Sequence, residues 1–239
     1  MPLKPTVPVI LAPMTTFVLI HSPLVGPSSL APTAAVLQTQ GFMAHVPTPD
    51  PARGLPAWRD WPQRLMDVLP KINEPILVGH SAGGLVAASL AASLRAKAVI
   101  CLDAMMPPEK GLTPPVEADF MSFVRTLPID EGLLPIWTDW WDGDLLAGTP
   151  TDNASKALFL AELPRLPLSW FEDAFEMPDW SACARGYIQT SPVFEDEASR
   201  AEELGWPVAR LKGTHLHPAL APAETAQALI DICRTLSAI

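Results

Sequence analysis

The chain has 239 residues, of which 49% are hydrophobic and 18% charged, so it can bury a large core and lacks the composition of a disordered protein. Twenty-six acidic against 16 basic side chains give a formal net charge of −10, which argues against nucleic acid and anionic membranes as partners. Cys101, Cys183 and Cys233 lack the spacing of a zinc site or a disulfide framework, so we expect reduced thiols in a cytoplasmic protein.

The N-terminal stretch 1–22 contains an apolar run that resembles a signal peptide. Pro5, Pro8 and Pro13 interrupt this run, and its last residues are needed as a core strand, so we do not expect cleavage. No run reaches the roughly 18 apolar residues of a membrane span. We therefore expect a protein without a membrane span, whose partner is a small molecule.

Short apolar runs alternate with amphipathic segments along the chain. Such runs are typical of parallel strands buried on both faces, and the amphipathic segments predict helices. We therefore predict an α/β fold with a doubly wound, mostly parallel sheet flanked by helices. The predicted strands are 17–21, 41–46, 75–80, 97–103, 185–190 and 207–212, and the predicted helices are 29–40, 58–69, 82–94, 195–204 and 222–236.

Residues 105–180 break this alternation with many prolines and five of the eight tryptophans. We expect them to form a helical lid, inserted after the strand that ends at Asp103 and counted as the sixth strand, with 1–104 and 181–239 forming the core. Large aromatic side chains suit an apolar roof over a pocket, and they suit packing of the insertion on the core equally well. The candidate pocket residues are Trp137, Trp140 and Trp141.

The segment PILVGHSAGGLVAASLA, residues 75–91, holds a Gly-x-Ser-x-Gly pentapeptide between a predicted strand and a predicted helix. A sharp turn in this context, known as a nucleophile elbow, exposes the serine hydroxyl, while Gly79 and Gly83 leave room for the neighbouring strand and helix. The helix N-terminus favours developing negative charge. We therefore predict that Ser81 is a nucleophile.

A serine hydroxyl needs a base to take its proton, and the chain has five histidines. His21, His45 and His80 belong to predicted strands or to the elbow, and we expect them to be packed or hydrogen-bonded. His215 and His217 follow the last predicted strand, as the base does in hydrolases with this elbow. We favour His215, with His217 as the fallback. A metal pair formed by these two lacks a suitably spaced third ligand, so we expect no metal and no cofactor.

The base needs a carboxylate that fixes its tautomer and stabilises its charged form. Such an acid most often follows the predicted strand 185–190, but the turn 191–193 contains no carboxylate. Glu195 and Asp196 come slightly later and fit the acidic first turn of a helix. Asp103 ends the strand that follows the nucleophile strand, at the catalytic edge of the sheet. We assign the acid role to Asp103 and keep Glu195 and Asp196 as alternatives.

These residues resemble the α/β-hydrolase fold superfamily, nearest to its branch of plant methyl esterases and hydroxynitrile lyases. The resemblance is carried by the segments FVLIHSPLVGP, PILVGHSAGGLVAA, AVICLDAMMPPEKG and KGTHLHPALAPAE. It implies that Ser81 attacks an acyl carbonyl, that His215 moves the proton and that water hydrolyses the acyl-enzyme. A lyase of this branch would have a lysine after the triad histidine and a threonine after the early strand. This chain has Leu216 and Ser22 there, which favours hydrolysis.

The resemblance also implies an oxyanion hole made of two backbone N–H groups. One belongs to Ala82, the residue after the serine. The other would belong to Pro23, which has no N–H. Either Leu24 donates in its place, with the loop shifted by one residue, or the Ser22 hydroxyl substitutes. Losing one donor typically lowers the rate by about 10²- to 10³-fold, so without such a replacement we expect a poor esterase or a binding protein.

Three functions therefore stay open. The first is a serine hydrolase that cleaves a carboxylic ester, or less readily an amide, of a small and mostly apolar compound. The second is a small-molecule binding protein without turnover, and the third is a lyase or carbon–carbon hydrolase on the same scaffold. The sequence discloses neither the substrate nor the oligomeric state, and a homodimer is compatible with it.

Overall fold

The computed structural model describes residues 14–142, 146 and 152–239. The prolines that argue against a signal peptide lie outside these residues, as does part of the expected lid. Six strands form one fully parallel sheet in the order β2-β1-β3-β4-β7-β8. They are β1 (Thr16–Ile20), β2 (Met43–His45), β3 (Ile76–His80), β4 (Ala98–Leu102), β7 (Ala184–Gln189) and β8 (Val208–Arg210).

The strand order confirms the doubly wound sheet. The chain moves outward from β1 to β2, returns to pair β3 with the other edge of β1, and then continues away through β4, β7 and β8. In such a sheet the loops at the carboxyl ends of the strands part at the point of reversal, here between β1 and β3. The residues that follow β1, β3 and β4 therefore converge on one edge of the sheet.

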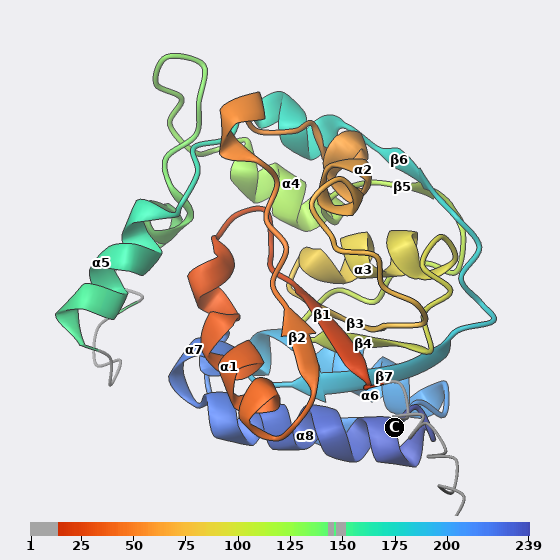
Figure 1. Cartoon of the computed structure of the whole chain (residues 1–239). Helices are drawn as coiled ribbons and strands as arrows, with labels where there is room; N and C mark the ends of the chain where they lie inside the picture. The colour runs from red at the N-terminus through yellow and green to blue at the C-terminus, as the bar shows by residue number, and fades with distance from the viewer. Residues whose placement is uncertain (1–13, 143–145, 147–151) are drawn as a thin grey trace, which may run out of the picture.

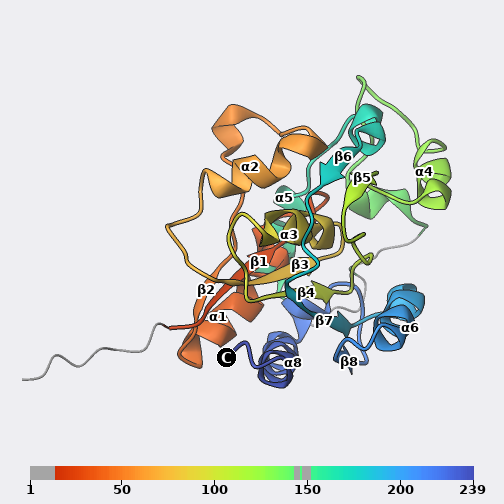
Figure 2. The same ribbon diagram turned by 90° about the vertical axis from the view of Figure 1, so that its right-hand side faces the viewer.

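Helices cover both faces of the sheet (Figures 1 and 2). Helices α2 and α3 pack on one face around Val18, Leu77 and Val99, while α1 and α8 pack on the other around Leu19 and Ile100. Because successive side chains of a strand point to opposite faces, these continuous apolar strands supply both layers. The helices of the core are α1 (Ala31–Thr39), α2 (Trp61–Met66), α3 (Gly83–Ala91), α6 (Glu195–Glu203), α7 (His217–Leu220) and α8 (Pro222–Thr235).

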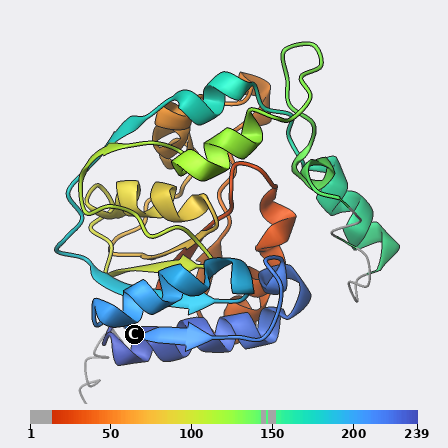
Figure 3. The same ribbon diagram turned by 180° about the vertical axis from the view of Figure 1, so that it is seen from behind.

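The insertion between β4 and β7 does not join the six-stranded sheet. Its short strands β5 (Gly111–Thr113) and β6 (Phe175–Met177) pair with each other in antiparallel fashion, and its helices are α4 (Ala118–Val124) and α5 (Asn153–Ala161). In the reverse view, α5 projects from the side of the molecule (Figure 3). The insertion follows the fourth strand of the described chain rather than a sixth, because the described residues contain only three strands ahead of β4.

Within the described ranges, no helix has both the length and the apolar character needed to cross a membrane. The three cysteines are free thiols, two of them buried. Burial raises the pKa of Cys101 to about 12 and that of the partly exposed Cys183 to about 11. The cysteines are therefore protonated and serve to pack the protein.

Candidate active site

Ser81 lies in the turn between β3 and α3 with a left-handed backbone, at a φ of 56°. Its N–H donates to the carbonyl of Leu102 at 3.2 Å, and its own carbonyl accepts from the N–H of Gly84 at 3.0 Å. A non-glycine residue with this backbone costs about 1–3 kcal/mol and persists only when its surroundings enforce it. The surroundings here are the end of β4 and the first turn of α3.

Two glycines make this turn possible. A Cβ added at Gly79 would collide with the backbone of Gly83 and Gly84, and one added at Gly83 would collide with the carbonyl oxygen of Ile20. The first turn of α3 thus lies directly against the end of β1. This close approach brings the residues after β1 next to Ser81.

Asp103 and His215, the acid and base proposed from the sequence, are hydrogen-bonded to each other. Oδ2 of Asp103 accepts from Nδ1 of His215 at 2.7 Å. The carboxylate of Asp103 is fully buried, whereas the His215 side chain is 22% exposed. With Nδ1 donating to the carboxylate, the Nε2 atom of a neutral His215 ring is an acceptor and can serve as a base.

The Asp103 carboxylate has three further donors. Oδ1 accepts from the N–H groups of Thr190 at 2.8 Å and Ser191 at 2.9 Å, and Oδ2 accepts from the Ser191 hydroxyl at 2.6 Å. Burial is the largest influence on the pKa of Asp103 and raises it. The hydrogen bond and charge of His215, with the bonds from Ser191 and Thr190, outweigh burial and hold this pKa below its usual range. Asp103 is therefore ionised at neutral pH.

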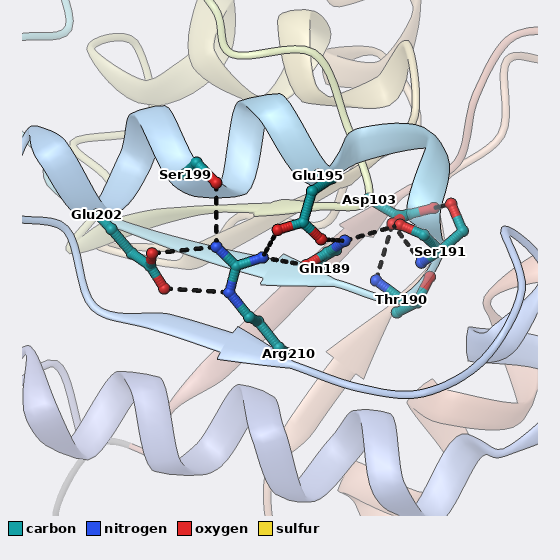
Figure 4. Close-up of polar contacts among 8 residues, drawn as sticks. All are labelled: Asp103, Gln189, Thr190, Ser191, Glu195, Ser199, Glu202 and Arg210. Carbon is teal, nitrogen blue, oxygen red and sulfur yellow. Dashed lines mark hydrogen bonds and ion pairs between the residues drawn. The ribbon is translucent and has the colours of Figure 1, made fainter.

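The alternative acids lie elsewhere. Glu195, at the start of α6, forms an ion pair with Arg210 on β8 at 2.6 Å and accepts from the Gln189 amide at 2.7 Å (Figure 4). Asp196 is exposed in the first turn of α6. We therefore retain Asp103 as the proposed acid.

The alternative base has a different partner. His217 is buried, and its Nε2 atom lies 2.9 Å from Oε2 of Glu224 on α8. Its ring occupies the space in which a side chain at Gly213 would stand. His217 thus holds the loop after β8 against α8. The described residues contain no cluster of three metal-ligating side chains.

His80 links the elbow to His215. The Nε2 atom of its buried ring lies 2.8 Å from the backbone oxygen of His215, and the two rings are 4.6 Å apart between centroids. Because a carbonyl only accepts, Nε2 of His80 carries the proton. Burial, followed by the charge of a protonated His215, lowers the pKa of His80 to about 3, so this ring stays neutral.

His215 therefore lies next to the residue that precedes Ser81. In the described chain no hydrogen bond joins the Ser81 hydroxyl to the His215 ring. Catalytic hydrogen bonds of this kind often close only in the substrate complex, where the two atoms need to come within about 3 Å.

The second hydrogen-bond donor of the oxyanion hole is expected from the loop after β1. The Leu24 N–H, one of the two candidate donors, points to the Ser22 hydroxyl oxygen at 3.2 Å. Ser22 is buried, and the described residues provide no acceptor for its hydroxyl proton. The Ala82 N–H, at the start of α3, likewise donates to no described residue. The Ser22 hydroxyl and the Ala82 N–H are therefore the donors available to an oxyanion, and Pro23 has no N–H to donate.

The three candidate tryptophans have different surroundings. The ring of Trp137 lies 6.1 Å from that of His215. Trp140 packs against Phe171 at 5.7 Å, and Trp141 stacks on Phe123 at 4.9 Å. The last two contacts lie inside the insertion, so only Trp137 is beside the proposed catalytic residues.

The sequence matches the profile of the Alpha/beta hydrolase family over residues 17–228. This chain belongs to that family. Membership accounts for the parallel sheet and the turn at Ser81, and it supports hydrolase activity. No curated protein sequence matches the chain.

Several solved structures share the fold of this chain. Polyneuridine aldehyde esterase is 19% identical with a TM-score of 0.67, covering 92% of this chain and 99% of its own. The extracellular α/β-hydrolase from a Paenibacillus species is 18% identical with a TM-score of 0.68, covering 91% and 98%. The pyrethroid hydrolase PytH is 19% identical with a TM-score of 0.68, covering 95% and 100%. At these identities the likeness shows the fold alone.

Sequence reasoning missed the groups that surround the proposed catalytic residues. Ser191 stands where the late acid was expected and instead donates to Asp103. Phe194 stacks on His215 with ring centroids 5.4 Å apart. Ser191 was the available signal for this contact. A serine in the 191–193 turn cannot act as the missing acid, but its hydroxyl can donate a hydrogen bond to a carboxylate from another strand.

Proposed function

We propose that this α/β hydrolase is a serine hydrolase that cleaves a carboxylic ester of a small, mostly apolar compound through an acyl-enzyme on Ser81. The observation that carries the proposal is the hydrogen bond from His215 to the buried, ionised Asp103 beside the elbow. That bond orients the imidazole with a free Nε2 and stabilises its charged form. The left-handed backbone at Ser81 supports the proposal, because the nucleophile elbow of this family holds its serine in such a sharp, strained turn.

The chemistry follows in two halves. Nε2 of His215 takes the Ser81 proton as Oγ bonds to the acyl carbon, and the same proton then passes to the departing alcohol oxygen. Water next attacks the acyl-enzyme, gives a proton to His215 and releases the carboxylic acid as the proton returns to Ser81. The Ala82 N–H and the Ser22 hydroxyl would stabilise the negative oxygen of both tetrahedral intermediates.

A fluorophosphonate probe and a panel of chromogenic esters test this function. The wild type should be labelled and should turn over esters, and Ser81→Ala or His215→Ala should lower kcat by about 10⁴-fold or more. Ser89→Ala is the matched control, because the Ser89 hydroxyl bonds to the Val86 carbonyl within α3. Labelling that survives in Ser81→Ala would refute the assignment.

A second candidate function is binding without turnover. The observation that favours it is the loop after β1, where Pro23 has no N–H and that of Leu24 is engaged. If Ser22 does not replace the missing donor, the chain would bind an ester or acid and release it unchanged. Equilibrium binding of an ester without acid production over hours would support this candidate.

A further inference from the structure

Thr190 and Ser191 are the two residues that directly follow β7, and we call them the 190–191 segment. Both residues are buried. Neither side chain is a carboxylate or an imidazole, so the segment supplies no acid or base to the proposed reaction. Its hydrogen bonds nevertheless reach the proposed acid on one side and the loop of the proposed base on the other.

Three donors of the 190–191 segment bind the Asp103 carboxylate (Figure 4). The N–H groups of Thr190 and Ser191 donate to Oδ1, and the Ser191 hydroxyl donates to Oδ2 at 2.6 Å. Oδ2 is also the atom that accepts from Nδ1 of His215. The carboxylate of an aspartate rotates readily about its last side-chain bond, so Oδ2 stays in one place only when both oxygens have partners. The Ser191 hydroxyl therefore fixes the oxygen that orients the base.

The 190–191 segment also binds the loop after β8. The Thr190 hydroxyl donates to the carbonyl of Thr214 at 2.9 Å, and the Thr190 carbonyl accepts from the N–H of Gly213 at 3.0 Å. Thr214 directly precedes His215 in the chain. Two adjacent hydroxyls thus have different targets: that of Ser191 reaches the acid, and that of Thr190 reaches the residue before the base.

The sheet explains why such a link is needed. Strand β7 lies between β4, which Asp103 follows, and β8, whose loop carries His215. Neighbouring strands are about 4.8 Å apart, so β4 and β8 are separated by roughly 10 Å. The acid and the base must therefore meet across the end of β7, where the 190–191 segment holds both.

A buried glutamine fixes the segment from the side of α6. Nε2 of Gln189 donates to the Ser191 carbonyl at 3.0 Å and to Glu195 at 2.7 Å, and its Oε1 accepts from Arg210 at 2.6 Å (Figure 4). Both the nitrogen and the oxygen of this amide are therefore engaged. The segment keeps these bonds, and its two backbone donors to Asp103, when a side-chain hydroxyl is removed. Variants that lack one hydroxyl should consequently fold.

We propose that Ser191 and Thr190 are positioning residues of the proposed reaction, the Ser191 hydroxyl by fixing the Asp103 carboxylate and the Thr190 hydroxyl by fixing the loop of His215. Both act through other residues and exchange no proton with the substrate. The inference rests on the proposed function, because it concerns how the acid and the base of that reaction are held. Loss of such positioning raises the barrier of the chemical step more than it weakens substrate binding.

Ser191→Ala tests the first hydroxyl. It should lower kcat on a chromogenic ester by about 10- to 100-fold with KM within about twofold, because a hydrogen bond to a charged group is lost. Ser191→Thr keeps the hydroxyl and should recover most of the activity. Turnover is divided by the number of sites that a fluorophosphonate labels to completion, so a smaller folded fraction does not imitate the loss. Equal kcat values for the two variants would overturn the role of Ser191.

Ser199→Ala is the matched control for Ser191→Ala. The Ser199 hydroxyl lies in the same network but contacts Arg210 at its exposed end, 3.3 Å away, and not Asp103 (Figure 4). This variant should keep kcat within about twofold of the wild type.

Thr190→Val tests the second hydroxyl at nearly constant side-chain volume. A hydrogen bond between neutral groups is weaker, so kcat should fall by about 3- to 10-fold, and Thr190→Ser should restore it. Thr225→Val is the control, because this buried threonine bonds to the Ala221 carbonyl within α8. A wild-type kcat in Thr190→Val would refute the role of Thr190.

A double-mutant cycle separates positioning from a general structural effect. If Ser191 acts through Asp103, Ser191→Ala should lower kcat by no more than about twofold once Asp103→Asn has removed the acid. A structural effect would instead lower kcat by the same factor in both backgrounds. That second result would overturn the proposal.

Proton NMR separates failure of this inference from failure of the proposed function. The Nδ1 proton that His215 shares with Asp103 should give a downfield resonance, which Ser191→Ala should move and Ser191→Thr should not. If that holds while the wild type hydrolyses no ester, the proposed function fails and the positioning stands. If the wild type is active and Ser191→Ala changes neither kcat nor the resonance, the positioning fails and the proposed function stands.

Discussion

Asp103 and His215 lie 112 positions apart in sequence and share a 2.7 Å hydrogen bond between Oδ2 and Nδ1. Asp103 also has a left-handed backbone, with φ at 45°, directly after β4. This turn directs its carboxylate toward the backbone N–H groups that follow β7. The proposed base is thus oriented by a side chain that is itself held by four hydrogen bonds.

Asp103→Asn is expected to lower kcat by about 10⁴-fold, because the amide can donate to Nδ1 and favours the wrong tautomer. Glu195→Gln, the matched change at the alternative acid, should leave kcat within about twofold. Steady-state kinetics on one chromogenic ester measure both. Near wild-type activity in Asp103→Asn would move the acid role elsewhere.

Ser22→Ala should lower kcat by about 10²- to 10³-fold, because it removes the proposed second oxyanion donor. Ser22→Thr keeps the hydroxyl and should retain most of the activity. The rates of ester turnover and of fluorophosphonate labelling report this donor independently of substrate affinity. Full activity in Ser22→Ala would show that the oxyanion is stabilised without this hydroxyl.

His80 is expected to position His215 through the hydrogen bond to its backbone oxygen. His80→Phe keeps the ring volume and removes the donor, so the base should shift and kcat should fall by about 10- to 100-fold with KM little changed. His80→Gln retains an N–H donor and should recover much of this loss. Equal activities for the two variants would assign His80 to packing alone.

Ser81→Gly should be more stable than Ser81→Ala by about 1 kcal/mol, because glycine adopts the left-handed backbone without a Cβ clash. Both variants lack the nucleophile, so the comparison isolates backbone strain. Urea unfolding of the two proteins gives the difference. Equal free energies of unfolding would mean that the turn is not strained.

The neutral, buried His80 should make the fold sensitive to acid. The unfolded chain takes up a proton on this residue below pH 6.5, whereas the folded chain does so only near its pKa of about 3. The free energy of unfolding should therefore be unaffected above pH 6.5 and fall below it, by up to about 1.4 kcal/mol per pH unit. His21, whose pKa burial also lowers, acts in the same direction.

Denaturant titrations of wild type and His80→Gln between pH 7 and about pH 4 test this dependence. That range lies above the usual pKa of aspartate, so Asp103 contributes little to it. The variant should lose stability less steeply than the wild type. Parallel curves would contradict the assignment of the slope to His80.

Local patterns were enough to predict the core. The apolar runs at β1, β3 and β4 are continuous because both faces are buried, and Gly79 and Gly83 mark the turn because no other residue fits there. The family and the position of Ser81 could therefore be predicted from residues adjacent in the chain. The contact between Asp103 and His215 was predicted as well, because both follow strands of one parallel sheet.

Contacts between distant segments decided the rest. The sequence left two candidates for the second oxyanion donor, the Leu24 N–H and the Ser22 hydroxyl. Only the folded loop shows that the Leu24 N–H already donates to the Ser22 hydroxyl oxygen. It also grouped three tryptophans that the fold separates, leaving Trp137 beside His215. A cavity lined by the loops after β1 and β2 and by the end of α5 forms only when these segments meet, and no local periodicity encodes such a meeting. Contacts between loops that are distant in the chain depend on how the folded segments pack together. Local sequence patterns do not specify that packing.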